Sequence, residues 1–116
     1  MRSSEPGQAG AVDRAAMLDR YRTLVQVDLP ERARRDRWVL RLDHCFGRVL
    51  LDHAVGRCWY EALDRRGPAY RQLDDAQLAG AVRMGEQLLL EGDPLLRRLD
   101  AQSLQWRGKA PKRHLA

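Results

Sequence analysis

The chain has 116 residues, enough for one domain, and its 44% apolar and 32% charged residues are typical of a soluble globular protein. It has no apolar run of about 18 residues and no secretory signal, so the sequence predicts a cytoplasmic protein with no membrane contact. Its net charge of +5 keeps nucleic acid open as a partner.

Residues 1–12 are predicted to be a disordered N-terminus, because the first ten are rich in Gly, Ser and Pro. A first helix is predicted over residues 13–27, with Asp13 able to cap its start. Apolar residues recur there at spacings of three and four, as expected for one face of a helix. They are Met17, Leu18, Tyr21, Leu24 and Val25.

A central helix is predicted from Pro30 to about Val55. The segment Asp28-Leu29-Pro30 is expected to break the chain, and proline suits a first helical turn. On a helical wheel the helix is apolar over most of its circumference, so we expect neighbours to enclose it on several sides. The apolar residues are Trp38, Val39, Leu40, Leu42, Phe46, Val49, Leu50, Leu51 and Ala54.

One narrow arc of this central helix is basic. It contains Arg34, Arg37, Arg41, Arg48 and Asp52. Basic helix faces bind phosphate groups, and residues 107–116 add four basic groups without an acid, so nucleic acid is a possible partner. The alternative is an ordinary solvated face interleaved with acidic side chains.

Two ionisable residues, Asp43 and His53, lie inside the apolar arc. Burying either without a partner would cost a few kcal/mol, so each must find a partner or line a cavity. They are therefore the catalytic candidates. They lie about 80° apart on one helix, which does not bring them together by itself. The alternative is a structural role in which polar contacts fix the helix register.

Beyond Gly56, which is expected to kink or end the central helix, residues 65–68 form a predicted loop. Asp74 and Gln77 resemble a capping box and open a further helix. Its buried stripe is predicted to be Leu78, Ala81, Val82, Gly85, Leu88 and Leu89.

Gly80 and Gly85 are expected to let this helix approach the central helix closely. Gly92 fits the end of the helix, and Asp93-Pro94 fits the start of a last one that reaches residue 106. A basic C-terminal tail over residues 107–116 follows.

No segment alternates apolar and polar residues long enough to be a strand. The sequence therefore predicts an all-α fold, with residues 13–106 forming a single domain. We expect a small bundle of three main helices plus one or two short ones around a central buried helix.

No metal site and no cofactor are predicted. His44, Cys45, His53 and Cys58 are metal-binding residue types, but their spacing matches no zinc motif, and core packing is the alternative. The chain has no Walker A loop and no GxGxxG. Residues 105–110 have the Q/R-x-x-G-x-G/A spacing with which acyl-CoA N-acetyltransferases hold pyrophosphate, but a predicted helix precedes it, so we interpret the match as chance.

Several short runs resemble a set of small uncharacterised bacterial proteins, some labelled as GNAT-type N-acetyltransferases. The runs are Leu42-Asp43-His44-Cys45-Phe46, Val49-Leu50-Leu51-Asp52, Gly56, Trp59-Tyr60, Pro68-Ala69-Tyr70, and Ser103-Leu104 with Trp106-Arg107-Gly108-Lys109. The label implies a mixed α/β fold and acyl transfer, whereas the patterns here predict no strand. The matched positions of interest are Asp43, His44, Asp52, Trp59, Tyr70 and Trp106.

The predicted function is a non-enzymatic binding or accessory module, with a protein partner or self-association ahead of nucleic acid. Trp59 and Tyr70 are the aromatic binding candidates, because Trp, Tyr and Arg are favoured at interfaces. A homodimer is plausible because the central helix needs much covering. The alternative is a small-molecule or acyl-transfer enzyme that uses the Asp43/His53 region.

Overall fold

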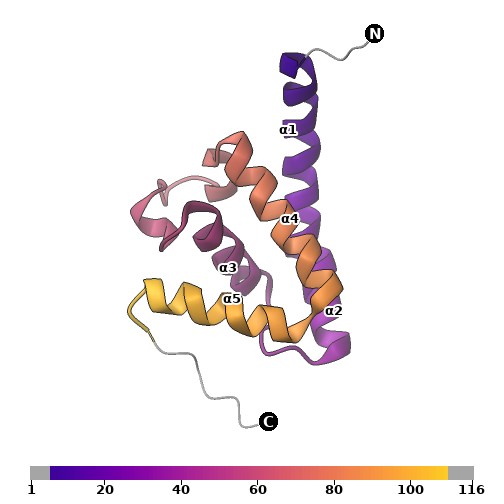
Figure 1. Cartoon of the computed structure of the whole chain (residues 1–116), viewed down its shortest axis with the longest axis vertical. Helices are drawn as coiled ribbons and strands as arrows, with labels where there is room; N and C mark the ends of the chain where they lie inside the picture. Colours follow the sequence, from indigo (N-terminus) through magenta and orange to yellow (C-terminus); the bar gives the residue numbers. More distant parts are fainter. Residues whose placement is uncertain (1–5, 110–116) are drawn as a thin grey trace.

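The computed structural model describes residues 6–109, with side chains from residue 14 onward, and these residues form a small all-α bundle (Figure 1). No strand occurs among them, which confirms the predicted fold class. The elements in chain order are α1 (Pro6–Thr23), η1 (Leu24–Asp28), α2 (Leu29–Asp36), α3 (Asp43–Val55), η2 (Trp59–Glu61), η3 (Ala69–Gln72), α4 (Asp75–Glu91) and α5 (Asp93–Trp106).

Two predicted segments fall partly outside this range. Residues 1–5 of the predicted disordered N-terminus and residues 110–116 of the predicted basic tail lie outside the described residues. The first helix begins at Pro6, earlier than the predicted residue 13.

Elements α1, η1 and α2 form one continuous helical rod (Figure 1), so the break predicted at Asp28-Leu29-Pro30 is wrong. Pro30 has no N–H, and its ring would clash with the carbonyl four residues earlier in a regular α-helix. Directly before it, η1 is a π-helical turn in which the Leu29 N–H bonds to the Leu24 carbonyl, five residues back. This wider turn lets the rod pass through Pro30.

The predicted central helix over residues 30–55 is in fact two helices, because α2 ends at Asp36 and α3 begins only at Asp43. Arg37 ends α2 in the left-handed conformation, with φ of 59°. Trp38 then turns into the core, where its side chain is 3% exposed and packs edge-on against Phe46. Burial of the indole outweighs the helix propensity of the stretch, which sequence periodicity alone cannot weigh.

α3 is nonetheless the buried central helix that the apolar pattern predicts, in a shorter form. Phe46, Val49 and Leu50 are fully buried, and the helix packs against η1, α2, α4, α5 and η2. Its first turn is different, because Leu42 is 55% exposed and Asp43 is also exposed.

The capping box predicted at the start of α4 is confirmed. The Asp74 carboxylate accepts the Gln77 N–H at 2.7 Å, and the Gln77 side chain accepts the Asp74 N–H at 2.9 Å. The close approach to the central helix predicted at Gly85 is also found, since a Cβ there would lie 3.5 Å from Leu50 Cδ1 of α3, and it would lie 2.9 Å from Leu24 Cδ1 of η1. The same expectation for Gly80 is wrong, because a Cβ there would meet only the Arg83 guanidinium, at 3.9 Å.

α5 ends in a Schellman motif centred on Gly108. The Gly108 N–H bonds to the Gln105 carbonyl at 3.0 Å, the Lys109 N–H bonds to the Leu104 carbonyl at 2.8 Å, and Gly108 has φ of 70°. The glycine in the Q-x-x-G pattern is therefore a helix C-cap, in agreement with the interpretation of that pattern as chance.

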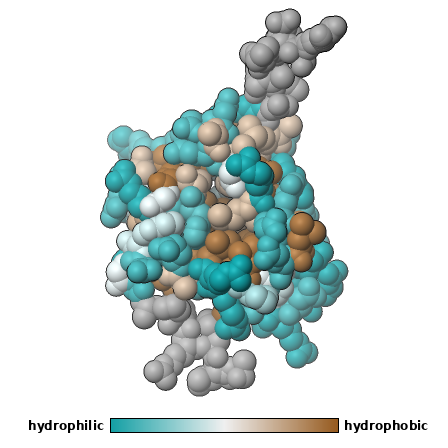
Figure 2. Space-filling model, viewed as in Figure 1, coloured by the Kyte–Doolittle hydropathy of each residue, from teal (hydrophilic) through white to brown (hydrophobic). Residues whose placement is uncertain are grey.

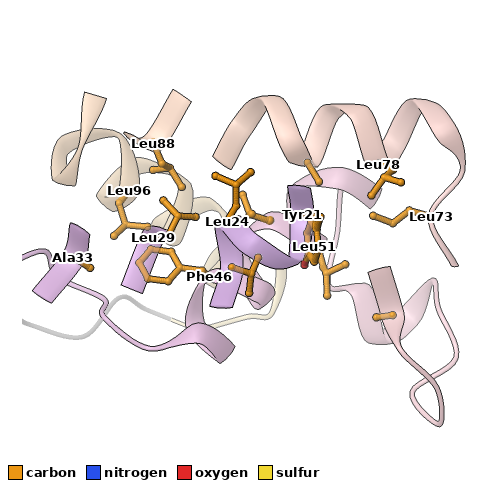
Figure 3. Packing of buried hydrophobic residues seen from close by; sticks show 14 of the residues in the cluster. Tyr21, Leu24, Leu29, Ala33, Phe46, Leu51, Leu73, Leu78, Leu88 and Leu96 are labelled. Carbon is orange, nitrogen blue, oxygen red and sulfur yellow. The ribbon is translucent and has the colours of Figure 1, made fainter. Parts of the chain in front are cut away.

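The apolar core lies where the rod, α3 and α4 meet (Figure 3). Leucines from all three gather there with Phe46 and with Leu96 of α5. The face drawn in Figure 2 is mostly hydrophilic, with apolar surface in separate areas. Within the described part of the chain, no helix is long and apolar enough to span a bilayer.

Candidate functional site

A buried carboxylate, that of Asp52, ties the end of α3 to α5 and η2. Its side chain is 0% exposed and accepts four hydrogen bonds. The Arg107 guanidinium donates two of them, at 2.8 and 3.0 Å, the Ser103 hydroxyl donates one at 2.6 Å, and the Trp59 backbone N–H donates one at 2.9 Å. With both carboxylate oxygens used twice, Asp52 is a structural anchor and has no lone pair left for a ligand.

A second ion pair extends this network. The Arg48 guanidinium donates to the Asp100 carboxylate and, at 2.7 Å, to the Ser103 hydroxyl. The Asp100 side chain is 8% exposed and that of Arg48 is 20% exposed. Ser103 therefore joins the two pairs, and the four charged groups sum to zero across the α3–α5 interface.

Arg107 carries the clearest electrostatic signature of the network. Its hydrogen bonds to Asp52 raise the pKa of the guanidinium, against the opposing effect of burial. Arg107 is charged at every relevant pH in any case, so the shift expresses how firmly Asp52 holds it. Arg107, the first residue of the predicted basic tail, directly follows α5 and is held against the folded domain by Asp52.

Beside this network the surface is hollowed. The hollow has a volume of about 350 Å³ and is lined by His44, Gly47, Arg48 and Leu51 of α3, by Trp59 and Tyr60 of η2, and by Arg107. The α3 residues occupy positions i, i+3, i+4 and i+7, so they share one helix face. Arg48 and Arg107 thus lie between the buried acids and the hollow.

The aromatic wall of the hollow is held by its own contacts. Trp59 and Tyr60 pack edge to face, with ring centroids 4.6 Å apart. The Arg107 guanidinium lies 4.7 Å from the centroid of the Tyr60 ring, and that of Arg65 lies 4.0 Å from it. These distances are typical of cation–π contacts, which fix Tyr60 although it is 45% exposed.

A second hollow, of about 390 Å³, lies between α2 and α4. It is lined by Asp28, Glu31, Arg32, Arg35 and Leu89. Arg32 already donates to the Leu89 carbonyl there at 2.8 Å. This hollow has no aromatic wall and four charged side chains of both signs, so it offers less to a ligand.

The structure does not bring the two catalytic candidates together. Asp43 is exposed at the start of α3, where its carboxylate accepts the His44 N–H at 2.8 Å. His53 lies about 15 Å further along the helix. Its Nε2 is 2.8 Å from the Leu99 carbonyl, and its ring packs on Trp106 with centroids 4.9 Å apart. Neither residue lines the hollow.

The basic binding candidates do not share one helix face. Arg34 lies on α2, Arg37 and Arg41 lie in the connection 37–42, and Arg48 lies on α3. The prediction of a single basic arc is therefore wrong. The first three are exposed, whereas Arg48 is drawn into the buried network.

The two aromatic candidates also differ. Tyr70 stacks on Tyr21, with centroids 5.1 Å apart and planes 13° apart, and so completes the core between α1 and η3. Trp59 stands in the wall of the hollow.

Both cysteines are free, with Cys58 buried and Cys45 half-buried. Among the described residues, no group of three or more His, Cys, Asp or Glu side chains could hold a metal ion.

The pairing of Asp52 with Ser103 and Arg107 was not anticipated. A signal for it exists, since Asp100 and Ser103 on α5 and Arg107 directly after it recur at helical spacing and contact Arg48 and Asp52, which lie at i, i+4 on α3.

Comparisons with family models, with curated proteins and with solved structures find no match to this chain.

Proposed function

We propose that the chain is a non-enzymatic binding module that holds a segment of a protein partner in the hollow beside Trp59 and Tyr60. The observation that carries this proposal is the composition of the hollow, which combines two aromatic side chains with two arginines on a concave surface. Trp, Tyr and Arg are the residues that contribute most binding energy at protein interfaces.

The arginines of the hollow are fixed before any partner arrives. Asp52 and Ser103 hold Arg107 and Arg48 from behind, so neither side chain loses much rotamer freedom on binding. The Arg48 Nε–H makes no hydrogen bond to another described residue. Preorganised donors cost less entropy on association than flexible ones, which favours recognition of an acidic or carbonyl group of the partner.

The lining of the hollow favours binding over acyl transfer. It contains no serine, cysteine or carboxylate, and the Asp43/His53 region on which the enzyme alternative depends is not part of it. The two free cysteines support the cytoplasm, where thiols stay reduced, as the place of action.

The test is photo-crosslinking from position 44, at the exposed rim of the hollow, followed by affinity measurement with the purified crosslinked partner. Tyr60→Ala is expected to weaken binding by about 2 kcal/mol or more, which is about 30-fold. Leu90→Ala is the matched control, because Leu90 is 81% exposed on α4 and does not line the hollow.

Equal affinity of the Tyr60 and Leu90 variants would overturn the proposal. Crosslinks to a second copy of the chain, with a concentration-dependent mass in sedimentation equilibrium, would identify the partner as the protein itself.

A further inference from the structure

Arginines without a partner are concentrated in one short stretch of the chain. Most of the described arginines form an ion pair or lie over an aromatic ring. Within the part of the chain that the structure describes, those that do neither are Arg34, Arg37, Arg41, Arg57 and Arg83. The first three lie within eight residues of sequence, at the end of α2 and in the connection 37–42. We call these three the arginine triad.

Among the described residues, no acidic side chain forms an ion pair with the triad, although Glu31 and Asp36 lie on the same helix as Arg34 and Asp43 follows Arg41 by two residues. Asp36 lies 3.2 Å from Arg35 and 3.9 Å from Arg32, while Asp93 pairs with Arg97 at 2.6 Å. Asp43 is engaged with the His44 backbone N–H. Residues 31–43 hold five arginines and three acids, so the segment keeps a net charge of +2, and the triad faces solvent because all three of its side chains are exposed.

The connection that carries the triad is anchored to the core. The Trp38 side chain is 3% exposed, and its indole lies against Gly92, where an added Cβ would be 3.7 Å from Nε1. The Val39 N–H donates to the Asp93 carboxylate at 2.7 Å, and the Arg41 Nε donates to the Trp38 carbonyl at 3.1 Å. These contacts fix the backbone from which Arg37 and Arg41 project.

Arg37 occupies a position that favours glycine. With φ of 59° and ψ of 48° it ends α2 in the left-handed region, and its N–H caps the Ala33 carbonyl. For a residue with a Cβ this conformation is unfavourable, and glycine adopts it freely. A helix end needs no arginine here, so the strained residue itself points to a role for its side chain.

We infer that the arginine triad is a binding site for the phosphate backbone of nucleic acid. The guanidinium fork matches phosphate oxygens in two-point geometry. The only aromatic side chain of the connection, Trp38, is buried, so the site cannot stack on bases and its contacts are independent of sequence. An acidic protein is the less favoured partner, because no residue of the triad lines either of the two hollows described above and the aromatic side chain of the connection is buried.

The first experiment measures the affinity of the full chain for a short labelled DNA duplex by fluorescence anisotropy at several salt concentrations. Three phosphate contacts predict a loss of about 40-fold for a fourfold rise in salt, since each contact contributes about 0.9 to the slope. Arg34→Gln with Arg41→Gln should reduce that slope by about 1.8. Arg57→Gln with Arg83→Gln changes the net charge equally and should leave the slope nearly unchanged.

The second experiment uses Arg37→Gly, which separates binding from folding. This variant should raise the midpoint of thermal unfolding, because it relieves the left-handed arginine, and should weaken duplex binding. Arg37→Lys should keep most of the binding. A stabilised glycine variant that binds the duplex as well as the parent chain overturns the role of Arg37.

Two results would overturn the whole inference. One is that neither the DNA duplex nor a single-stranded RNA binds to the protein at low salt, whereas polyglutamate does. That result would assign the triad to an acidic protein partner. The other is equal loss of binding in the two double variants, which would reduce the effect to net charge. Neither result bears on the hollow at Tyr60, because none of its lining residues belongs to the triad.

Discussion

The α1–α4 interface and the α3–α5 interface place their charges in opposite ways. Between α1 and α4 the interior is apolar, and arginines pair with acids only along the exposed edges, as Arg14 does with Asp75 and Arg20 with Glu86. Between α3 and α5 the carboxylates of Asp52 and Asp100 lie inside the interface. Edge charges can be lost singly at little cost, whereas each buried charge depends on the others.

The largest effect is expected from Asp52→Asn. It leaves the Arg107 guanidinium, 10% exposed, without its carboxylate, and breaking a buried pair costs about 3–5 kcal/mol of unfolding free energy. Urea denaturation followed by circular dichroism measures this loss. Asp52→Asn combined with Arg107→Gln should cost less than the two single changes added together. Strict additivity would show that the groups act independently.

Gly85→Ala tests how tightly the apolar interface is packed. The new Cβ would lie 2.9 Å from Leu24 Cδ1, and Leu24 is fully buried, so we expect a net destabilisation of about 1–2 kcal/mol despite better helix propensity. Gly47→Ala on α3 is the control, because its Cβ would meet only Val25 at 3.9 Å. That variant should gain about 0.5–1 kcal/mol. The midpoints of thermal unfolding of the two variants test this expectation. If both substitutions stabilised the protein, the core around Gly85 would be less tightly packed than the structure indicates.

Tyr21 gives the apolar interface a pH dependence at alkaline pH. Burial raises the pKa of its hydroxyl above the ordinary value, so the unfolded chain loses this proton first. Stability is unaffected by this group below about pH 10 and then falls by about 1.4 kcal/mol per pH unit until the folded protein also ionises. Tyr21→Phe should remove this component from stability curves measured on both sides of pH 10. The same alkaline slope in the variant would place the effect elsewhere.

The smallest effect is expected from Glu86→Gln, which breaks an exposed edge pair. Hydrogen bonds to Glu86 and then Asp28 raise the pKa of Arg20, but the paired side chains are 36% and 49% exposed. Water and salt screen such a pair, so the loss should be at most about 1 kcal/mol and should shrink in added salt. A loss as large as that of Asp52→Asn would abolish the contrast between the two interfaces.

Local patterns were sufficient for the parts of the fold that depend on local chemistry. The absence of strands, the capping box at Asp74 and the burial of Phe46 and Leu50 all follow from periodicity and capping. The turn at residues 37–42 does not, because its cause is the burial of Trp38 against Gly92, a contact across 54 residues. The helix break predicted at Pro30 failed for a related reason, since the π-helical turn before Pro30 lets the helix continue through the proline.

The candidate site was only partly predictable. Trp59 and Arg48 were proposed from sequence and do line the hollow, whereas Asp43 and His53 were selected from an apolar arc that assumed one unbroken helix. The wheel placed Asp52 in the basic arc and the resemblance marked it as a position of interest, but neither indicated its partners. Asp52 becomes the centre of a buried network only because α5 packs onto α3. The residue pattern of a single helix does not determine which other helix packs against it.

The position of Arg107 in the chain affects how the protein is made. The ribosome synthesises Asp52 well before its partners Ser103 and Arg107, which follow 51 and 55 residues later. Until Ser103 and Arg107 have been synthesised, the Asp52 carboxylate lacks three of the four hydrogen bonds that it accepts in the folded protein, so burying it would be unfavourable. The α3–α5 interface therefore depends on the last turn of α5, and we expect a chain truncated before Ser103 to leave this interface open.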